Sequence, residues 1–525
     1  MKASDLLVAA LEREGVEHVF GLPGEEMEDL LFSLRDSDVT FVPVRHEQGA
    51  AFMADVHGRL TGEAGVCLST LGPGATNLLT GVADAHLDKA PLVAVTAQGG
   101  LERLHVESHQ AIDVLGMFEP ITKWNTQLDD PDIVHEAVRK AFRTAEYEKP
   151  GATHLELPED VAAREATVEP LATRDPVARG DPNPEAMDRV REYFLAAERP
   201  LIVAGNGVVR TGAAPALRDL VAATDVPVVS TYMGKGAVPD DDPRSLMTVG
   251  SGPDGEAADA IAGADLLVTV GYDIAEHDPA DWDHTGRVVH VDSEPAEVSE
   301  GYHPDVEVVA DVGRTLAALS DWCEDAGLTF DPDWYADLRK AIVADADRTP
   351  SESPPFTVPD VLPLLREAMA PEDVLVSDVG SHKMAIAQYF PTHEPNTCIV
   401  SNGLASMGIA VPGGLAADLA VDANVVAATG DGGFLMNAAE IETATRLGCG
   451  YTVVVFVDDD YGLISEQQVE HTGESFGTRL TNPDLVTFAE SFGIAGYRPE
   501  SPAELREAFE SAVGNGMSLI EVRVA

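Results

Sequence analysis

The chain has 525 residues, of which 34 are Lys or Arg and 90 are Asp or Glu, so its formal net charge is −56 at pH 7. This surplus of acid excludes nucleic acid as a partner, because the protein surface and the phosphate backbone repel each other. A hydrophobic content of 45% excludes a disordered acidic chain, and acids spread along the whole sequence favour a folded protein adapted to high intracellular salt.

The amino-terminal end and the cysteines predict a protein of the cytoplasm. Residues 1–5 lead into an amphipathic helix without a signal peptide, and no run of about 18 apolar residues predicts a membrane span. Cys67, Cys323, Cys398 and Cys449 have no paired spacing. We therefore expect buried thiols rather than a disulfide framework or a zinc site.

The first third contains two segments with candidate binding residues. A strand-like run ending at Val44 gives way to an alanine-rich helix that begins near Glu47. The helix dipole favours a carboxylate in the first turn, and this structural reading explains Glu47 by itself. Farther along, Thr70-Leu-Gly-Pro-Gly-Ala-Thr-Asn77 predicts a turn followed by a helix. Turn and capping chemistry explains Thr70, Pro73 and Asn77 as well as contact with a ligand does.

The middle of the chain contains four short apolar runs, at residues 201–207, 226–230, 266–271 and 288–292. They predict buried parallel strands that alternate with helices, and hence a Rossmann-like domain. Gly205-Asn206-Gly207 is only a fragment of a dinucleotide fingerprint, since no third glycine follows at the required spacing. We therefore expect no NAD site.

Two acidic loops follow predicted strands in the last third. Gly430-Asp431-Gly432-Gly433 follows an apolar run at 425–429, and Asp458, 27 residues after Asp431, follows another run at 451–457. Open α/β sheets bind ligands at the carboxyl ends of their parallel strands. Because proteins hold Mg²⁺ with one or two carboxylates and phosphate oxygens, the two loops predict a metal beside a diphosphate. Gly-Asp-Gly by itself is also typical of a tight turn.

Polar, proline-containing segments at 169–184 and 348–355 predict two domain boundaries, and the length suits about three domains. We therefore expect an α/β protein with three Rossmann-like, doubly wound parallel-sheet domains, at 1–168, 185–325 and 355–525. The first and last domains are expected to share a fold without a short-period sequence repeat.

Together, these segments resemble the thiamine diphosphate-dependent 2-oxoacid carboligases and decarboxylases, and within that family the acetolactate synthases. The resemblance covers nearly the whole chain. It implies a pyrimidine-binding first domain and a diphosphate-binding last domain. Beside the acidic loops, the segments that carry it are Gly21-Leu-Pro-Gly24, Arg45-His-Glu-Gln-Gly-Ala50, residues 70–77, Asp84-Ala85, Ser108-His-Gln110, Ser377-Asp-Val-Gly-Ser-His382 and Ser401-Asn-Gly-Leu-Ala-Ser-Met-Gly408.

The resemblance implies a site for thiamine diphosphate. By it, Glu47 is hydrogen-bonded to N1′ of the aminopyrimidine, Gln110 faces the cofactor, and Met407 supports the bend between its two rings. A Met in an apolar stretch is otherwise more often core filler. The other residues implied to bind the cofactor are Thr70, Pro73, Asn77, Gly380, Ser381, His382, Gly430, Gly432, Gly433 and Tyr461.

The implied Mg²⁺ ligands are Asp431, Asp458 and the backbone carbonyl of Asp460. The family usually has two Asn where this chain has Val457-Asp458. A second carboxylate adds negative charge beside the diphosphate, which puts the affinity for the metal and its identity in question. It leaves the expected fold unchanged.

Two segments help to choose a subfamily. Residues 271–282 resemble the FAD-free acetolactate synthases and lack the Arg-Phe-Asp-Asp-Arg pattern of the FAD-containing enzymes, so FAD is not expected. Residues 461–468 lack the Gln-Trp pair of the biosynthetic enzymes. Gln467 falls where catabolic members have Gln, and it either lines the substrate pocket or faces solvent from a helix.

The resemblance implies decarboxylation of pyruvate and its carboligation to a second 2-oxoacid, a transferase reaction that gives 2-acetolactate. The alternatives are a related 2-oxoacid decarboxylase or carboligase with a different substrate, and a non-catalytic relative, which the intact Glu47, Asp431 and Asp458 disfavour. In the family the active site lies at a subunit interface, so a homodimer or homotetramer is expected. The sequence does not decide between branched-chain amino acid biosynthesis and acetoin formation, and leaves a regulatory subunit open.

Overall fold

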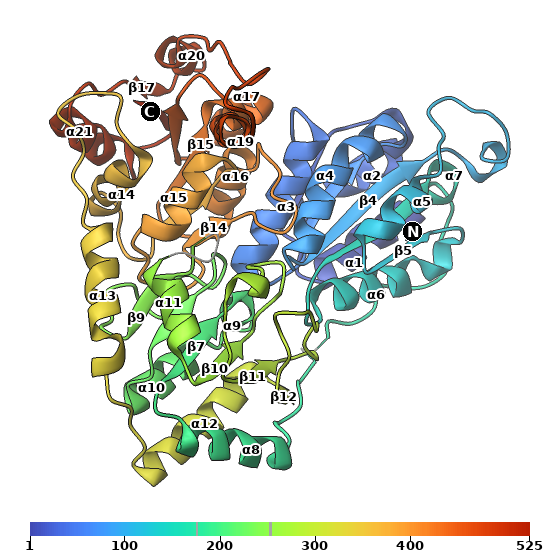
Figure 1. Ribbon diagram of the computed structural model, residues 1–525. Coiled ribbons are helices and arrows are strands. Elements are labelled where there is room, and N and C mark those ends of the chain that lie inside the picture. The colour runs from blue at the N-terminus through green and yellow to red at the C-terminus, as the bar shows by residue number, and fades with distance from the viewer. Residues whose placement is uncertain (175–176, 251–254) are drawn as a thin grey trace. The chain divides into compact units, whose positions relative to one another are not determined.

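The computed structural model describes residues 1–174, 177–250 and 255–525. Within them the chain forms three six-stranded sheets in succession (Figure 1), and all their strand pairs are parallel. The predicted α/β fold with three parallel-sheet domains is therefore confirmed. Asp175 and Pro176, in the boundary predicted at 169–184, lie outside the described residues.

The first sheet has the strand order β2-β1-β3-β4-β6-β5. Its strands are β1 (His18–Gly21), β2 (Thr40–Pro43), β3 (Gly65–Ser69), β4 (Leu92–Gln98), β5 (Trp124–Gln127) and β6 (Ala152–Pro158). The helices of this part are α1 (Ala3–Arg13), α2 (Glu28–Arg35), α3 (Glu47–Thr61), α4 (Pro73–Leu87), α5 (Val114–Phe118), α6 (Val134–Glu146) and α7 (Glu159–Ala162).

The middle sheet has the order β12-β11-β10-β7-β8-β9. From the opposite edge this is the strand order 3-2-1-4-5-6 of a dinucleotide-type Rossmann fold, with β7 as strand 1. Its strands are β7 (Pro200–Ala204), β8 (Val228–Ser230), β9 (Ser245–Thr248), β10 (Leu266–Val270), β11 (Arg287–Asp292) and β12 (Val306–Val309). Its helices are α8 (Pro184–Ala196), α9 (Asn206–Arg210), α10 (Ala214–Thr224), α11 (Glu256–Gly263), α12 (Val312–Ala326) and α13 (Asp333–Ala346).

The last sheet, β14-β13-β15-β16-β18-β17, repeats the strand order of the first sheet, so the two share a topology, as expected. Its strands are β13 (Val374–Ser377), β14 (Cys398–Val400), β15 (Val425–Gly430), β16 (Thr452–Val457), β17 (Ala495–Tyr497) and β18 (Ser518–Arg523). Its helices are α14 (Val358–Glu367), α15 (Ser381–Tyr389), α16 (Ala410–Ala420), α17 (Asp431–Asn437), α18 (Glu440–Leu447), α19 (Gly462–Thr472), α20 (Leu485–Ser491) and α21 (Pro502–Ala512).

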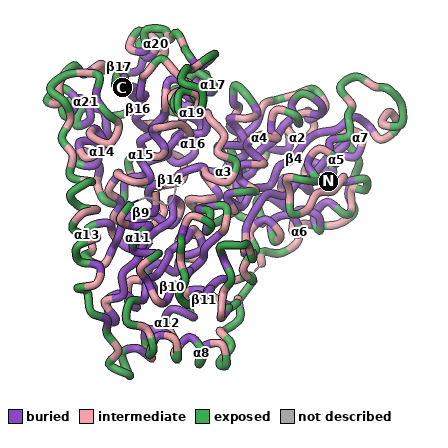
Figure 2. The backbone as a smooth tube through the Cα atoms, viewed as in Figure 1, coloured by how far each residue is buried: buried purple, intermediate pink, exposed green. Residues whose placement is uncertain are grey.

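The central strands are buried along their whole length, as β3, β4 and β16 show. Parallel sheets carry helices on both faces, which is why these strands are continuous apolar runs instead of alternating ones. Figure 2 shows the same contrast between buried strands and helices with exposed outer faces. Helix α19 differs from the other helices of the last domain because none of its residues is buried.

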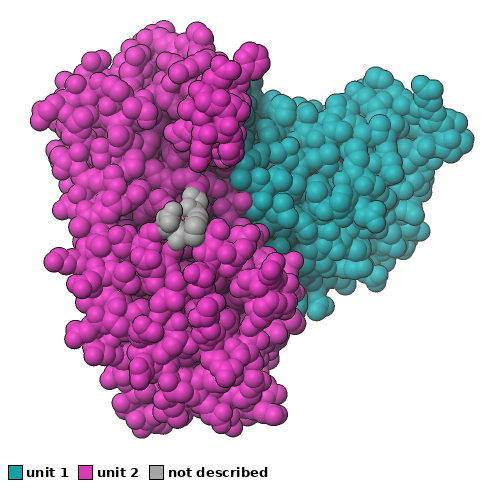
Figure 3. Space-filling model, in the orientation of Figure 1, with its two compact units in different colours: residues 1–177, 403–422, 433–451 teal, residues 178–402, 423–432, 452–525 magenta. Residues whose placement is uncertain are grey.

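The chain divides into two compact units (Figure 3). Unit 1 contains residues 1–177, 403–422 and 433–451, and unit 2 contains residues 178–402, 423–432 and 452–525. Unit 1 thus joins the first sheet to α16 and α18 from the last third of the chain, and α16 packs against α3 within it. Contacts define these units, whereas the domain boundaries predicted from the sequence stay predictions.

All four cysteines are buried and unpaired, as expected. Burial raises the pKa of the Cys323 and Cys398 thiols to about 11, so both stay protonated at neutral pH. No helix within the described part of the chain is both long and apolar enough to cross a membrane.

Candidate functional site

Glu47 is the first residue of α3 and is 4% exposed. His46 caps the helix, because its Nδ1 accepts a hydrogen bond from the Gln48 amide at 3.1 Å. The Asn77 side chain donates from Nδ2 to Glu47 Oε2 at 2.9 Å. The structure therefore brings together two predicted site residues from α3 and α4, and the amide fixes the direction of a buried carboxylate.

The turn before α4 lies close to Glu47 and to Gln110 at two different glycines. A Cβ on Gly74 would lie 3.0 Å from Thr70 Cγ2 and 3.3 Å from Glu47 Oε1. Gly72 has a φ of +48°, and a Cβ there would lie 2.4 Å from the Gln110 carbonyl oxygen. Pro73 stands between them as the first residue of α4. Gly74 thus lets the turn approach Glu47, and Gly72 lets it approach the Gln110 backbone.

Glu26 and Asn437, which were not predicted from the sequence, form hydrogen bonds in the region around Glu47. Thr70 Oγ1 donates to Glu26 Oε2 at 3.0 Å. Asn437 Nδ2 donates to the Gly408 carbonyl at 2.8 Å and lies 3.5 Å from Gln48 Oε1. The Met407 segment, in unit 1, is therefore tied to the residue that follows Glu47.

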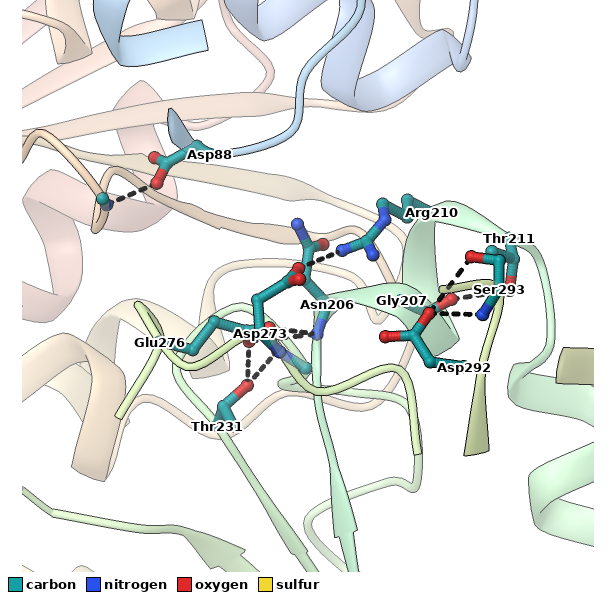
Figure 4. A network of polar contacts seen from close by, with 12 residues as sticks. Asp88, Asn206, Gly207, Arg210, Thr211, Thr231, Asp273, Glu276, Asp292 and Ser293 are labelled. Atoms are coloured by element: carbon teal, nitrogen blue, oxygen red, sulfur yellow. Dashed lines mark hydrogen bonds and ion pairs between the residues drawn. The ribbon is translucent and has the colours of Figure 1, made fainter. Parts of the chain in front are cut away.

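A buried cluster of one cation and three carboxylates joins α3 to α4. Arg59 donates to Asp55 at 2.7 Å, to Asp88 at 2.8 Å and to Asp84 at 3.2 Å. Burial raises the pKa of Asp55, although the Arg59 guanidinium opposes this shift. Asp88 also accepts a bond from the Gly403 amide, the contact drawn at Asp88 in Figure 4. The cluster thus connects both helices to the segment that leads to Met407.

In unit 2, the predicted diphosphate residues Gly380, Ser381 and His382 stand where β13 gives way to α15. Burial lowers the pKa of His382 to about 4, so the imidazole is neutral at neutral pH. A Cβ on Gly380 or on Gly430 would lie 2.9 or 3.2 Å from the imidazole ring, so the two glycines make room for it. His382 Nε2 is buried and has no hydrogen-bond partner among the described residues. An orphaned polar atom at this turn fits a site that takes a polar ligand.

The predicted metal carboxylates stand at the carboxyl ends of β15 and β16. Asp431 Oδ1 accepts from the Gly432 amide and Oδ2 from the Asp459 amide, each at 3.0 Å. Burial, together with the charge of Asp458, raises the pKa of Asp431 to about 6. Burial also raises the pKa of Asp458, whose Oδ1 accepts from the Asp460 amide at 3.0 Å. Two partly desolvated carboxylates that repel each other are stabilised by a hard cation.

Asn482 belongs to this cluster and was missed from the sequence. Its Nδ2 donates to Asp431 Oδ2 at 2.5 Å and to Asp459 Oδ1 at 2.8 Å. Within the described ranges, no group of three or more His, Cys, Asp or Glu side chains could hold a metal ion. Asp431 and Asp458 are two oxygen donors of the kind that Mg²⁺ takes, and oxygens of a ligand would have to complete its coordination.

The remaining predicted residues follow in the loop and helix after β16. Tyr461 caps α19, and its amide donates to the Thr478 carbonyl at 3.0 Å. Gln467 is exposed on α19, beside exposed Ile464 and Val469. Its place in a substrate pocket stays a prediction, because in unit 2 the side chain faces solvent.

The glycines of the middle domain have a packing explanation. A Cβ on Gly205 or Gly207 would lie 2.4–2.5 Å from backbone atoms of Gly271, so two loops meet there without side chains. Beside them, the Glu276 carboxylate accepts from the Asn206 amide at 3.0 Å and from the Thr231 hydroxyl (Figure 4). Burial, with the charge of Asp273, raises the pKa of Glu276 to about 8.

Comparison with known proteins gives family matches in all three parts of the chain. Residues 1–117 match the N-terminal TPP binding domain of thiamine pyrophosphate enzymes, residues 187–319 their central domain and residues 378–522 their C-terminal TPP binding domain.

Three curated relatives match nearly the whole length. The chain is 34% identical to the probable acetolactate synthase large subunit of Methanocaldococcus jannaschii, covering 98% of this chain and 90% of the relative. It is 31% identical to the acetolactate synthase of Bacillus subtilis, with coverage of 100% and 93%. It is 33% identical to the catabolic acetolactate synthase of Raoultella terrigena, with coverage of 99% and 94%.

Proposed function

Because the chain belongs to the thiamine pyrophosphate enzyme family, we propose that it is a thiamine diphosphate- and Mg²⁺-dependent enzyme that makes 2-acetolactate. It would decarboxylate pyruvate and join the remaining two carbons to a second 2-oxoacid. Full-length similarity to three relatives named as acetolactate synthases supports this reaction.

The proposal rests above all on Glu47. Its carboxylate is buried, is directed by the Asn77 amide and pairs with no Lys or Arg among the described residues. No ion pair among the described residues therefore competes with a ligand for this carboxyl group. When bound, thiamine diphosphate supplies the nucleophilic carbon and the electron sink that the reaction needs. In this proposal Glu47 holds the hydrogen bond to N1′ of the pyrimidine and controls the proton there.

The other site residues take holding roles in the same proposal. Asp431 and Asp458 bind Mg²⁺ together with the Asp460 carbonyl, in keeping with raised carboxyl pKa values at two adjacent strand ends. The Gly380–His382 turn and the glycines around Asp431 would donate hydrogen bonds to the diphosphate. Met407 supports the cofactor, and Thr70, Pro73, Asn77 and Gln110 line its pyrimidine side.

We extend the proposal to the protein's assembly and surroundings. A homodimer or homotetramer would complete the active site at a subunit interface, without FAD. Exposed Ile464, Val469 and Phe476, the last 90% exposed, are apolar side chains that such an interface would cover. The net charge of −56 supports a protein that works at high salt, and we place it in the cytoplasm as part of the proposal.

Product analysis tests the proposed reaction. The wild-type protein is incubated with pyruvate, thiamine diphosphate and Mg²⁺ in molar KCl, without FAD, and acetolactate and acetaldehyde are measured together. We expect acetolactate as the main product. Acetaldehyde with CO₂ and no acetolactate would instead show that the protein is a simple 2-oxoacid decarboxylase, which is the alternative function.

A further inference from the structure

Glu440 is a completely buried carboxylate at the start of α18, in the same compact unit as Glu47. Its Oε1 accepts hydrogen bonds from the backbone amides of Arg45 and His46, each at 3.0 Å, and its Oε2 lies 3.2 Å from the Arg45 amide. Thr443 Oγ1 donates to Oε2 at 2.6 Å. One side chain from the last third of the chain thus holds the two amides directly before Glu47.

The first turn of α3 is shaped to receive this side chain. A Cβ on Gly49 would lie 2.8 Å from Glu440 Oε1 and 3.2 Å from its Cδ. Any residue larger than glycine at position 49 would therefore push the carboxylate away from the amides. Glu440 fits between α18 and the beginning of α3 only because position 49 has no side chain.

The two amides have no acceptor in the first sheet, because they follow the end of β2 and precede the helix. Val44 is the last residue of this stretch whose amide bonds back to the sheet, at the Gly21 carbonyl. Arg45 and His46 are themselves exposed residues, so without Glu440 only water could take its place as the acceptor. Glu440 supplies the acceptor, so it sets where the chain turns from β2 into α3.

Glu440 acts here as a hydrogen-bond acceptor and not as half of an ion pair. No Lys or Arg within the described ranges forms an ion pair with it, and the Arg45 side chain instead lies 3.7 Å from Glu442. Burial raises the pKa of Glu440, while the Thr443 hydroxyl and the two amides favour its charged form.

We propose that Glu440 is a positioning residue for Glu47, which holds the Arg45–His46 backbone so that the Glu47 carboxylate points correctly from the first turn of α3. This role rests on the proposed function for Glu47. Its geometry, however, belongs to the protein without cofactor and can be tested there.

Three variants separate the possible roles. Glu440→Ala removes both acceptors. Glu440→Gln keeps the two 3.0 Å bonds to Oε1 and loses only the longer bond from the Arg45 amide to Oε2, at 3.2 Å. Its own amide then faces the Thr443 hydroxyl, which can turn to accept. Glu442→Ala is the matched control, because it removes another carboxylate of the same helix. Among the described residues, the Glu442 carboxylate forms ion pairs with the side chains of Arg45 and Arg446 and does not accept from the Arg45 or His46 amide.

Amide hydrogen exchange of the cofactor-free, full-length protein is the first test. In Glu440→Ala we expect the amides of Arg45 and His46 to exchange about tenfold faster, as for the loss of one hydrogen bond each. Glu440→Gln and Glu442→Ala should stay near the wild type. Unchanged protection of these two amides in Glu440→Ala overturns the proposal. If that variant does not fold, Glu440→Asp, which is one methylene shorter, must show the same faster exchange.

Kinetics of the loaded enzyme are the second test. We expect Glu440→Ala to lower kcat on the order of tenfold, with the Kd for thiamine diphosphate changed less than about threefold, and Glu440→Gln to restore most of kcat. A raised Kd with an unchanged kcat would overturn the positioning role. If the wild type itself does not turn over pyruvate, the proposed function fails, while the exchange result still decides whether Glu440 holds the backbone before Glu47.

Discussion

Replacing Glu156 by Gln should make the stability of the protein less dependent on pH. Glu156 lies on β6, is 2% exposed and accepts bonds from Gln98 and Gln127, each at 2.8 Å. The Gln98 side chain also donates to the Ile112 carbonyl, so this network supports the segment that carries Gln110. Burial raises the pKa of Glu156 from 4.5 to about 7, although the two amides oppose the shift.

The size and sign of the effect follow from this shift. Below pH 4.5 the Glu156 carboxyl is protonated in both the folded and the unfolded protein, so its titration does not change the free energy of unfolding. Between pH 4.5 and 7 only the folded protein keeps the proton, and stability falls as the pH rises. A shift of about 2.5 units corresponds to a loss of at most about 3 kcal/mol above pH 7. Glutamine does not titrate, so the variant escapes this loss.

Urea unfolding of wild type and Glu156→Gln at pH 5 and pH 8, at one KCl concentration, measures the effect. At each pH we take the free energy of unfolding of the variant minus that of the wild type. We expect this difference to be larger at pH 8 than at pH 5, by roughly 1–3 kcal/mol. Glu136→Gln, at an exposed position on α6, is the matched control and should show no such trend. A difference that stays the same at both pH values would refute the reasoning.

Three further predictions concern stability, metal and salt. Arg59→Met leaves three buried carboxylates without their cation and should lower the free energy of unfolding, measured in urea, by about 3–5 kcal/mol. Arg35→Met, at an exposed pair with Asp36, is the control and should lower it by less than about 0.5 kcal/mol. Equal losses in the two variants would contradict the importance of the Arg59 cluster. Asp431→Asn should abolish the rise in Tm that Mg²⁺ with thiamine diphosphate gives the wild type, and an unchanged rise would place the metal elsewhere. Lowering KCl from about 2 M to about 0.1 M should lower the Tm, because self-repulsion among 90 acids is then screened less, and a higher Tm at low salt would argue against salt adaptation.

The sequence predicted the parts of the structure that depend on local pattern. Apolar runs bounded by turn residues located strands such as β10 and β16, since strands buried on both faces have a continuous apolar signature. The two acidic loops were placed correctly at the ends of β15 and β16 for the same reason. The contact of Glu47 with Asn77 agrees with placing both residues in one site, although their role stays a prediction.

The sequence could not predict the partners that come from distant segments. Glu440 meets Arg45 across 395 positions, and Asn437 meets Gln48 across 389. No local period or spacing encodes such pairs, because only the tertiary fold brings them together. Asn482 and the Arg59 cluster were missed for the same reason: an isolated Asn or Asp in a helix or loop has an ordinary structural explanation.

Exchange of the cofactor's thiazolium C2 proton, measured in wild type and in Glu47→Gln, tests the central role of Glu47 most directly. Each protein is saturated with thiamine diphosphate and Mg²⁺, the Kd is measured, and deuterium incorporation is followed after acid quench. We predict exchange slowed on the order of a hundredfold or more in the variant, with the cofactor still bound. Exchange at the wild-type rate in Glu47→Gln would contradict the proposal that this buried carboxylate activates the cofactor.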